Sequence, residues 1–423
     1  MNARLRHLSR RTALMGERAP TFYDDPLIAV RAEGVWIYDE AGRKHLDAYN
    51  NVPHVGHSHP AVTEAVHQQL RRLNVHSRYV SPVVLDYLER LLALFDDPIE
   101  QAALTASGSE ANDLALRMAM VATGRTGIIA LDAAYHGNTA LTAAVSPRRT
   151  PVGGYPANVR LVPSPDNLNP LGGKPEAQPE AFAEGVRTAI RDLEAAGHGC
   201  AAMILCPIFA NEGLQSQPPG FLDAAAKALQ DADALLICDE VQAGFGRTGT
   251  HMWGHRAIGV APDIVTLGKP MGNGWPIAGV VTSREVMEAF QREHRHFSTF
   301  AATPPAAAAG TAVLDVMERE DLMGNARRTG HHLRARLAAL PHESIAQVRA
   351  AGLFVGVDLV RDGMNAGTIA REVVEGCRRR GVLIGRGGRD DHILKIRPPM
   401  PFNSGNADFV AAALDEALTE AGA

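Results

Sequence analysis

Between Val62 and Thr282 the sequence alternates short, continuously apolar runs with segments of helical periodicity. The strand-like runs are Ala102–Ala106, Gly127–Leu131, Ala201–Ile208, Leu235–Val241, Asp263–Leu267 and Ile277–Thr282. Continuous hydrophobicity indicates strands that are buried on both faces, which is typical of parallel sheets covered by helices. This region therefore predicts an α/β fold with a large, doubly wound, mainly parallel sheet.

The two ends of the chain predict a second, smaller unit. An alternating run at Val35–Tyr38 followed by a turn at Gly42 indicates a hairpin near the N-terminus. Towards the C-terminus, strand-like runs at Phe354–Val360 and Ile393–Arg397 lie among helical patterns, which is an α+β arrangement. We expect a small α+β domain made from residues 1–60 and 321–423, and a large domain over residues 61–320.

Composition and charge exclude several kinds of partner. The 423 residues carry a formal net charge of −5, so no basic excess favours nucleic acid or an anionic membrane. No run approaches the roughly 20 apolar residues of a membrane span. Residues 1–16 contain several arginines but no apolar signal-peptide core, so we expect a short polar arm there, and the alternative is a transit peptide. The four cysteines are scattered without CxxC spacing, which favours reduced thiols and a cytoplasmic location.

A polar motif at residues 107–112, Ser-Gly-Ser-Glu-Ala-Asn, follows one strand-like run and opens a helix. First-turn N–H groups lack intrahelical partners and the helix dipole favours an anion, so this motif is a candidate phosphate site. Gly108 would allow close approach and Ser109 would add a hydroxyl donor. The alternative is a serine N-cap with a glutamate capping box, and it is favoured when the motif is taken alone.

Asp239 ends a buried strand-like run, in Leu-Ile-Cys-Asp-Glu-Val-Gln. Such strand ends line the ligand crevices of open α/β sheets. A carboxylate there is costly unless it meets a cation, and a protonated pyridine nitrogen would be such a partner. The alternative is an ion pair with an arginine such as Arg247.

Lys269 follows another apolar run and lies in the glycine-rich turn Gly-Lys-Pro-Met-Gly-Asn-Gly. Partial desolvation would lower the pKa of this lysine and favour a Schiff base. The motif is not a phosphate-binding Walker A loop, because Pro270 stands where Ser or Thr is required. The alternative is an ordinary surface lysine.

Three histidines, His54, His57 and His59, lie close together near the N-terminus. A metal site would need a further carboxylate or cysteine at suitable spacing, so we expect a structural or substrate-loop role and no metal.

Taken in order, these motifs resemble the class III (ω-) aminotransferases, which are pyridoxal-phosphate (PLP) enzymes of fold type I. The resemblance extends from Gly34 to Phe402. The motifs that carry it are Ser107-Gly-Ser-Glu-Ala, Tyr135-His-Gly, Asp239-Glu-Val-Gln, Lys269 and Ser298-Thr-Phe. Finer features, such as Ser77-Arg-Tyr and Lys395-Ile-Arg-Pro-Pro-Met, resemble the branch that contains phosphoethanolamine and phosphohydroxylysine phospho-lyases.

The resemblance implies a role for each matching position. Gly108 and Ser109 would bind the cofactor phosphate. Tyr135 and Val241 would cover the two faces of the pyridine ring. The remaining cofactor contacts would be Asp239 at the ring nitrogen, Gln242 at the ring hydroxyl, and Lys269 as Schiff-base lysine and acid/base. Thr299 would reach the phosphate of a neighbouring subunit, which implies a homodimer with shared active sites.

Substrate binding is less well defined by the resemblance. Two departures concern it, because Cys206 and Lys395 stand where many family members have a glutamate and a carboxylate-binding arginine. Arg397, two residues further on, points to the same strand face and could substitute. Tyr79, Lys395 and Arg397 are therefore the candidate substrate residues.

Two reactions are compatible with these motifs. Family frequencies favour transamination from an amine or amino acid to an oxo-acid such as pyruvate. The first alternative is a phospho-lyase that eliminates phosphate and ammonia from a phosphorylated amino alcohol. The second alternative is a catalytically silent structural homologue, against which the intact Asp239 and Lys269 argue.

Overall fold

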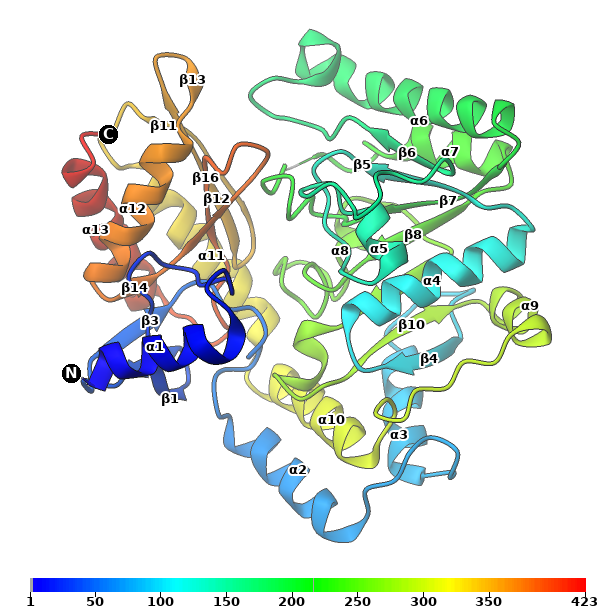
Figure 1. The fold of residues 1–423 in the computed structure, drawn as a ribbon, viewed down its shortest axis with the longest axis horizontal. Coiled ribbons are helices and arrows are strands. Elements are labelled where there is room, and N and C mark those ends of the chain that lie inside the picture. The colour runs from blue at the N-terminus through cyan, green and yellow to red at the C-terminus, as the bar shows by residue number, and fades with distance from the viewer. Residues whose placement is uncertain (1–2, 216) are drawn as a thin grey trace.

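The computed structural model describes residues 3–215 and 217–423. Its largest element is a seven-stranded sheet with the order β4-β10-β9-β8-β7-β5-β6 (Figure 1). The strands are β4 (Gln101–Thr105), β5 (Gly127–Leu131), β6 (Val159–Val162), β7 (Cys200–Leu205), β8 (Leu235–Asp239), β9 (Ile264–Leu267) and β10 (Ala278–Thr282). Strands β5 to β9 pair in parallel, whereas β10 is antiparallel to both neighbours. The predicted mainly parallel α/β sheet of PLP fold type I is confirmed.

Helices cover both faces of this sheet (Figure 1). One face packs against α4 (Gly108–Thr123) and α9 (Arg284–Glu293), and the other packs against α6 (Gln178–Ala195) and α7 (Asp223–Asp231). Neighbouring residues of β5 contribute to opposite layers, since Ile128 lies in the first apolar cluster and Ile129 in the second. This arrangement explains why the strands read as continuous apolar runs.

Both chain ends build the smaller part of the molecule. The N-terminal strands β1 (Ala29–Glu33), β2 (Trp36–Asp39) and β3 (Lys44–Asp47) form an antiparallel meander. Strand β3 then pairs in parallel with the C-terminal strand β14 (Val382–Leu383). We propose domain boundaries near residues 60 and 320, because both ends of the chain meet in this sheet.

A second sheet lies beside the first and has the order β11-β12-β16-β15. Its strands are β11 (Ile345–Ala351), β12 (Phe354–Arg361), β15 (Gly385–Gly387) and β16 (Ile393–Ile396), and β13 (Met364–Asn365) pairs with β12. Three helices pack around these strands, namely α11 (Leu322–Ala338), α12 (Gly367–Arg379) and α13 (Ser404–Glu420).

The remaining helices connect and flank these units. They are α1 (Ala3–Met15), α2 (Pro60–Arg72), α3 (Pro82–Leu92), α5 (Ala140–Ala144), α8 (Gly254–Ala257) and α10 (Pro304–Arg319). Helix α1 differs from the polar arm that we expected, and its side chains explain why it is held. Arg11 donates to the carbonyls of Ala19 and Pro20, and Arg4 donates to the carbonyl of Pro26. Among the described residues, every helix is too short or too polar to cross a membrane.

Candidate active site

A cavity of about 350 Å³ opens at the carboxyl ends of the central parallel strands. The end of β8, the start of α4 and the turn after β9 form its walls, together with the loops that follow β5 and β7. Open α/β sheets bind ligands at this edge. The cavity collects seven of the residues that the sequence singled out, which are Gly108, Ser109, Tyr135, Asp239, Val241, Gln242 and Lys269.

Asp239 is the last residue of β8 and is buried. Its Oδ2 lies 2.7 Å from Nδ1 of His136 and accepts a hydrogen bond of 2.9 Å from the amide of Asn112. The alternative partner Arg247 lies elsewhere, where it donates to the carbonyls of Leu353 and Pro398. The contacts with His136 and Asn112 fix the orientation of the Asp239 carboxylate, which also lines the cavity.

Lys269 follows β9 and begins the one-turn helix η3 (Lys269–Gly272). Burial and the nearby positive charge of Arg397 lower the pKa of Lys269 to about 8. Its backbone φ of 27° lies in the left-handed region, which side-chain-bearing residues rarely adopt outside functional sites. These properties contradict the surface-lysine alternative and give an amine that is nucleophilic near neutral pH.

The start of α4 offers free backbone N–H groups to the same cavity. The Ser107 side chain accepts from the N–H of Glu110, and Glu110 in turn accepts from the N–H of Ala106. The capping interpretation therefore holds, and it leaves Gly108 and Ser109 facing the cavity. Capping and anion binding use different groups of the same helix end.

Two glycine contacts shape this helix end. A Cβ on Gly137 would lie 2.7 Å from both Ser109 Oγ and Thr142 Oγ1, so only glycine leaves room for the Ser109 hydroxyl. A Cβ on Gly108 would lie 3.1 Å from the methyl groups of Val241. The two glycines thus allow the phosphate-site candidates and Val241 to pack closely.

Tyr135 and Val241 provide the apolar surfaces of the cavity. Val241 is buried, whereas 43% of Tyr135 remains exposed although the residue lies deep in the fold. An aromatic ring exposed within a cavity is suited to stacking on a flat, aromatic ligand.

Gln242 lies at the junction of the cavity and the small domain. Its Nε2 donates to Oδ1 of Asn211 at 3.3 Å, and its Oε1 accepts from the guanidinium of Arg397. Lys395, two residues before Arg397 on β16, is buried. Desolvation, together with the charges of Arg397 and Arg148, lowers the pKa of Lys395 to about 7.

Four candidates are absent from the cavity lining, namely Lys395 on β16, Arg397 directly after this strand, Thr299 and Tyr79. Thr299 is exposed and is absent from the cavity lining. Tyr79 lines a separate hollow with Phe297 and Ser298, and 64% of it is exposed. Within one chain, therefore, neither Thr299 nor Tyr79 lines the cavity that holds Lys269.

Several cavity residues were not assigned roles from the sequence. Asn112 and His136 hold Asp239, and the amide of Asn211 donates to the carbonyl of Tyr135 at 3.1 Å. Both Asn112 and His136 could have been found from the sequence, because they lie in the motifs quoted above. Asn112 is one helical turn after Gly108, and His136 directly follows Tyr135. Asn211 has no such local signal.

The histidine cluster is divided among separate partners. His57 contacts Asp47 at 2.7 Å, His59 contacts Glu320 at 3.3 Å, and His54 contacts the carbonyl of Phe245 at 2.7 Å. No group of three or more potential metal ligands occurs among the described residues. These separate contacts are those of histidines with a structural role.

The donor set of the cavity fits PLP in each of its parts. A helix N-terminus with Ser109 suits a phosphate, a buried Asp239 suits a protonated ring nitrogen, and Lys269 is an amine of lowered pKa. Fold and site together define a PLP-dependent enzyme of fold type I.

The chain belongs to the family described as Aminotransferase class-III, whose model matches residues 20–418. It is 43% identical to the solved structure of an Arthrobacter phospholyase in complex with phosphoethanolamine, with a TM-score of 0.94 over 98% of this chain and 99% of that one. It is 35% identical to "Ethanolamine-phosphate phospho-lyase homolog 1" of Caenorhabditis elegans, over 97% of this chain and 93% of the relative. It is also 37% identical to "Alanine–glyoxylate aminotransferase 2-like" of Drosophila melanogaster, over 96% and 85%. The silent-homologue alternative is therefore set aside, and the chain is an enzyme.

Proposed function

We propose that this enzyme is a phospho-lyase that eliminates phosphate and ammonia from a small phosphorylated amino alcohol. The observation that carries the proposal is Lys395. Lys395 is buried, and its ammonium has neither an ion pair nor a hydrogen bond within residues 3–215 and 217–423. A buried cation without a partner is costly, so a binding site for an anion is the natural reason to keep one.

The charge around Lys395 favours phosphate over carboxylate. Arg397 and Arg148 both lower the pKa of Lys395, but Arg148 is paired with Asp391 at 2.6 Å. Among the described residues, Lys395 and Arg397 are therefore two neighbouring cations without a carboxylate partner. Glu212 is an acid whose charge would act on Lys395, but burial raises the pKa of its carboxyl, which favours the neutral form. A dianionic phosphate compensates such an excess of positive charge better than a single carboxylate does. Cys206, in place of the common glutamate, adds no negative charge, because burial raises the pKa of its thiol.

The residues at the cofactor site would divide the work as follows. When bound, PLP supplies the electron sink that makes the substrate Cα–H acidic. Lys269 would hold the cofactor covalently, then yield to the substrate amine and remove the proton from Cα. Asp239 would pair with the ring nitrogen, and His136 and Asn112 would orient its carboxylate. The Cβ–O bond would then break with its electron pair leaving on phosphate, and water would release ammonia and an aldehyde.

Gly108 and Ser109 at the start of α4 would bind the cofactor phosphate. Tyr135 and Val241 would enclose the pyridine ring, and Gln242 would contact the ring hydroxyl. Thr299 would be supplied by the partner subunit, so we propose a cytoplasmic homodimer with shared active sites. The exposed position of Thr299 supports this assignment, as does its absence from the cavity lining of its own chain.

Transamination is the second candidate, and sequence alone ranks it first. The relative from Drosophila melanogaster that is named an aminotransferase supports it. Lys269 and Asp239 would serve both reactions equally, because the proton is removed from Cα in each. We favour elimination over transamination because Lys395 is unpaired.

The test is to incubate the holoenzyme with O-phosphoethanolamine without any oxo-acid and to measure free phosphate. We expect sustained, stoichiometric release of phosphate and ammonia. Lys269→Ala should lose both turnover and the visible absorbance band of lysine-bound cofactor. Pyruvate-dependent consumption of amine without phosphate release would overturn the proposal in favour of transamination.

A further inference from the structure

Arg397 is held from two sides next to Gln242, which lines the cavity. Its backbone N–H donates to the carbonyl of Ala48 at 2.9 Å, which fixes the start of the side chain. Its guanidinium donates to Oε1 of Gln242, a neutral acceptor. Among the described residues no carboxylate forms an ion pair with Arg397, and its buried Nε has no hydrogen-bond partner. The guanidinium therefore keeps unused donors, and its charge reaches both Lys269 and Lys395, because it lowers the pKa of each.

Tyr49 supplies the surface on which this guanidinium rests. The Cζ atom of Arg397 lies 4.3 Å from the centroid of the Tyr49 ring, which is a cation–π arrangement. The backbone of Tyr49 is fixed in turn, because its N–H donates to Asp47 Oδ1 at 3.1 Å. The Tyr49 hydroxyl makes no hydrogen bond within residues 3–215 and 217–423, so the ring carries the contact with Arg397.

A glycine in β15 makes room for the ring. A Cβ on Gly385 would lie 2.1 Å from Cε2 of Tyr49, a distance that no real pair of atoms could keep. Tyr49 can therefore lie against β15 only because this strand has no side chain at residue 385. The same strand places Gly387 against Lys395, where a Cβ would lie 3.0 Å from Nζ. Strand β15 thus accommodates both groups that flank Arg397.

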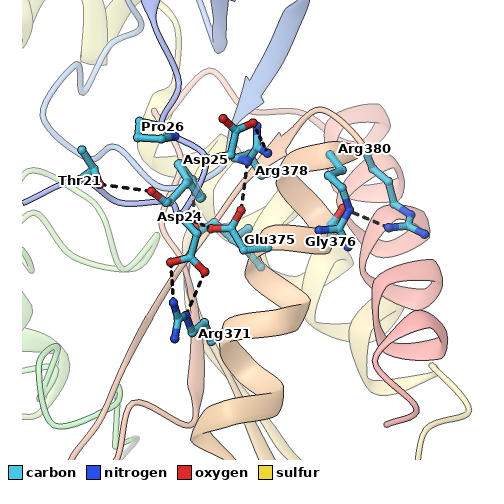
Figure 2. A network of polar contacts seen from close by, with 12 residues as sticks. Thr21, Asp24, Asp25, Pro26, Arg371, Glu375, Gly376, Arg378 and Arg380 are labelled. Carbon is cyan, nitrogen blue, oxygen red and sulfur yellow. Dashed lines mark hydrogen bonds and ion pairs between the residues drawn. The ribbon is translucent and has the colours of Figure 1, made fainter. Parts of the chain in front are cut away.

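The outer side of Tyr49 is covered by Phe22, whose ring meets it edge-on with a centroid separation of 4.8 Å and an interplanar angle of 71°. Phe22 belongs to the segment Thr21–Pro26, and Figure 2 shows how ion pairs hold this segment to α12. Arg371 donates two hydrogen bonds to Asp24, at 2.8 and 3.1 Å. Arg378 donates to Asp25 at 2.8 Å. This anchoring keeps Phe22 against Tyr49 although 71% of Phe22 is exposed.

We propose that Tyr49 is a positioning residue that holds the Arg397 guanidinium ready for the anionic group of the substrate, with Phe22 and Gly385 confining its ring. The inference deepens the proposed function and rests on it only in naming that anionic group as phosphate. A stacked, pre-oriented guanidinium loses less side-chain entropy when it binds an anion than a freely moving one does. Tyr49 itself needs no contact with substrate.

The test compares Tyr49→Leu with Tyr49→Phe in the holoenzyme. Leucine fills much of the same space without an aromatic face, whereas phenylalanine keeps the face and loses only the hydroxyl. Tyr38→Leu is the matched control, because it removes another arginine–tyrosine stack, with Arg31 at 3.7 Å, in the hairpin of the small domain. Each variant is titrated calorimetrically with inorganic phosphate, and KM and kcat are measured with O-phosphoethanolamine.

We expect Tyr49→Leu to weaken phosphate binding and to raise KM by about tenfold, which corresponds to the loss of one charge-assisted contact. Its kcat should change less than its KM. Tyr49→Phe and Tyr38→Leu should stay within about twofold of the wild type, and all variants should keep the cofactor absorbance band.

Unchanged phosphate affinity in Tyr49→Leu would overturn the inference, as would equal losses in Tyr49→Leu and Tyr49→Phe. A wild-type holoenzyme that does not bind inorganic phosphate would overturn it too. A different outcome would refute the proposed reaction alone. A wild type that binds phosphate in a Tyr49-dependent way, yet releases none from O-phosphoethanolamine, would leave the inference standing and refute the phospho-lyase assignment.

Discussion

Two lysines, Lys269 and Lys395, have a lowered pKa. Lys269 lies on the cavity wall beside Asp239, and its pKa of about 8 gives an amine that is ready to react. Lys395 lies in the interior on β16, where burial destabilises its charged form. The first lysine is suited to covalent chemistry and the second to holding an anion.

The burial of Lys395 predicts a pH-dependent stability. Its pKa of about 7 in the folded protein lies below the roughly 10.4 of an unfolded lysine, so between these values the unfolded state binds more protons. The free energy of unfolding of the wild type therefore rises with pH across this window. We expect Lys395→Met to stabilise the cofactor-free protein by about 1–3 kcal/mol at pH 7, and not at all near pH 10.

Urea denaturation at pH 7 and pH 10 checks this prediction. Lys227→Met is the control, because Lys227 is exposed on α7 and pairs with Asp231 at the surface. It should change stability by less than about 0.5 kcal/mol at pH 7. If Lys395→Met still raises the free energy of unfolding at pH 10, then packing, rather than the charge of Lys395, limits stability at this position.

At the residue scale, the sequence allowed us to predict functional side chains at the ends of strands. It did not allow us to predict contacts between side chains of different domains. Asp239 and Lys269 could be found because each directly follows an apolar run, and the edge of a parallel sheet gathers such positions. The contact between Tyr49 and Arg397 joins residues 348 positions apart, and Gly385 of β15 leaves the room for the tyrosine ring. Periodicity describes one element at a time, so it carries no information about such a contact.

At the scale of elements, the junction of α4 with the loop after β5 decides how the cofactor phosphate would be held. Gly137 has a φ of 145° and leaves room for the Ser109 hydroxyl. Gly137→Ala would force Ser109 or Thr142 away and would strain the backbone as well. We expect PLP to bind the free enzyme about tenfold more weakly, as measured by fluorescence titration.

Gly154→Ala separates the two causes. Gly154 also has a positive φ, of 85°, but an added Cβ there would meet only open space. That variant should bind PLP as the wild type does. Equal weakening in both variants would mean that backbone strain in this part of the chain, and not the Ser109 contact, sets the affinity.

The elements themselves were largely predictable. The six strand-like runs correspond to strands β4, β5, β7, β8, β9 and β10. The run from Ala201 extends beyond the end of β7 at Leu205, because the apolar residues that follow stay buried after the chain has turned. Helix α1 was not predicted, because its arginines indicated a solvated polar arm. In the structure, Arg4 and Arg11 instead donate hydrogen bonds to the segment that follows the helix.

At the scale of the whole molecule, the proposed dimer explains an exposed apolar region. Val80 is 86% exposed and lines a hollow together with Tyr79 and Phe297. Monomeric proteins rarely leave such side chains together in water. We expect a wild-type dimer, and we expect Val80→Asp to weaken association at least about tenfold, since a carboxylate would be buried at the interface.

Sedimentation equilibrium measures this effect, and PLP retention is followed in the same samples. Met364→Asp is the control, because Met364 is 71% exposed on the β12–β13 hairpin, away from the hollow that Val80 lines. It should leave the dimer intact. A monomeric wild type that still retains PLP would refute the assignment of Thr299 to the partner's site.

The parallel pairing of β3 with β14 also has a consequence for synthesis on the ribosome. Leu46 needs Val382 as its neighbour, so the first strands of the chain wait for a partner until nearly all of it has emerged. The seven-stranded sheet, by contrast, is complete at Thr282. The emerging chain would therefore expose the apolar side of its first hairpin for most of translation, and truncation near residue 380 should leave a product that chaperones retain.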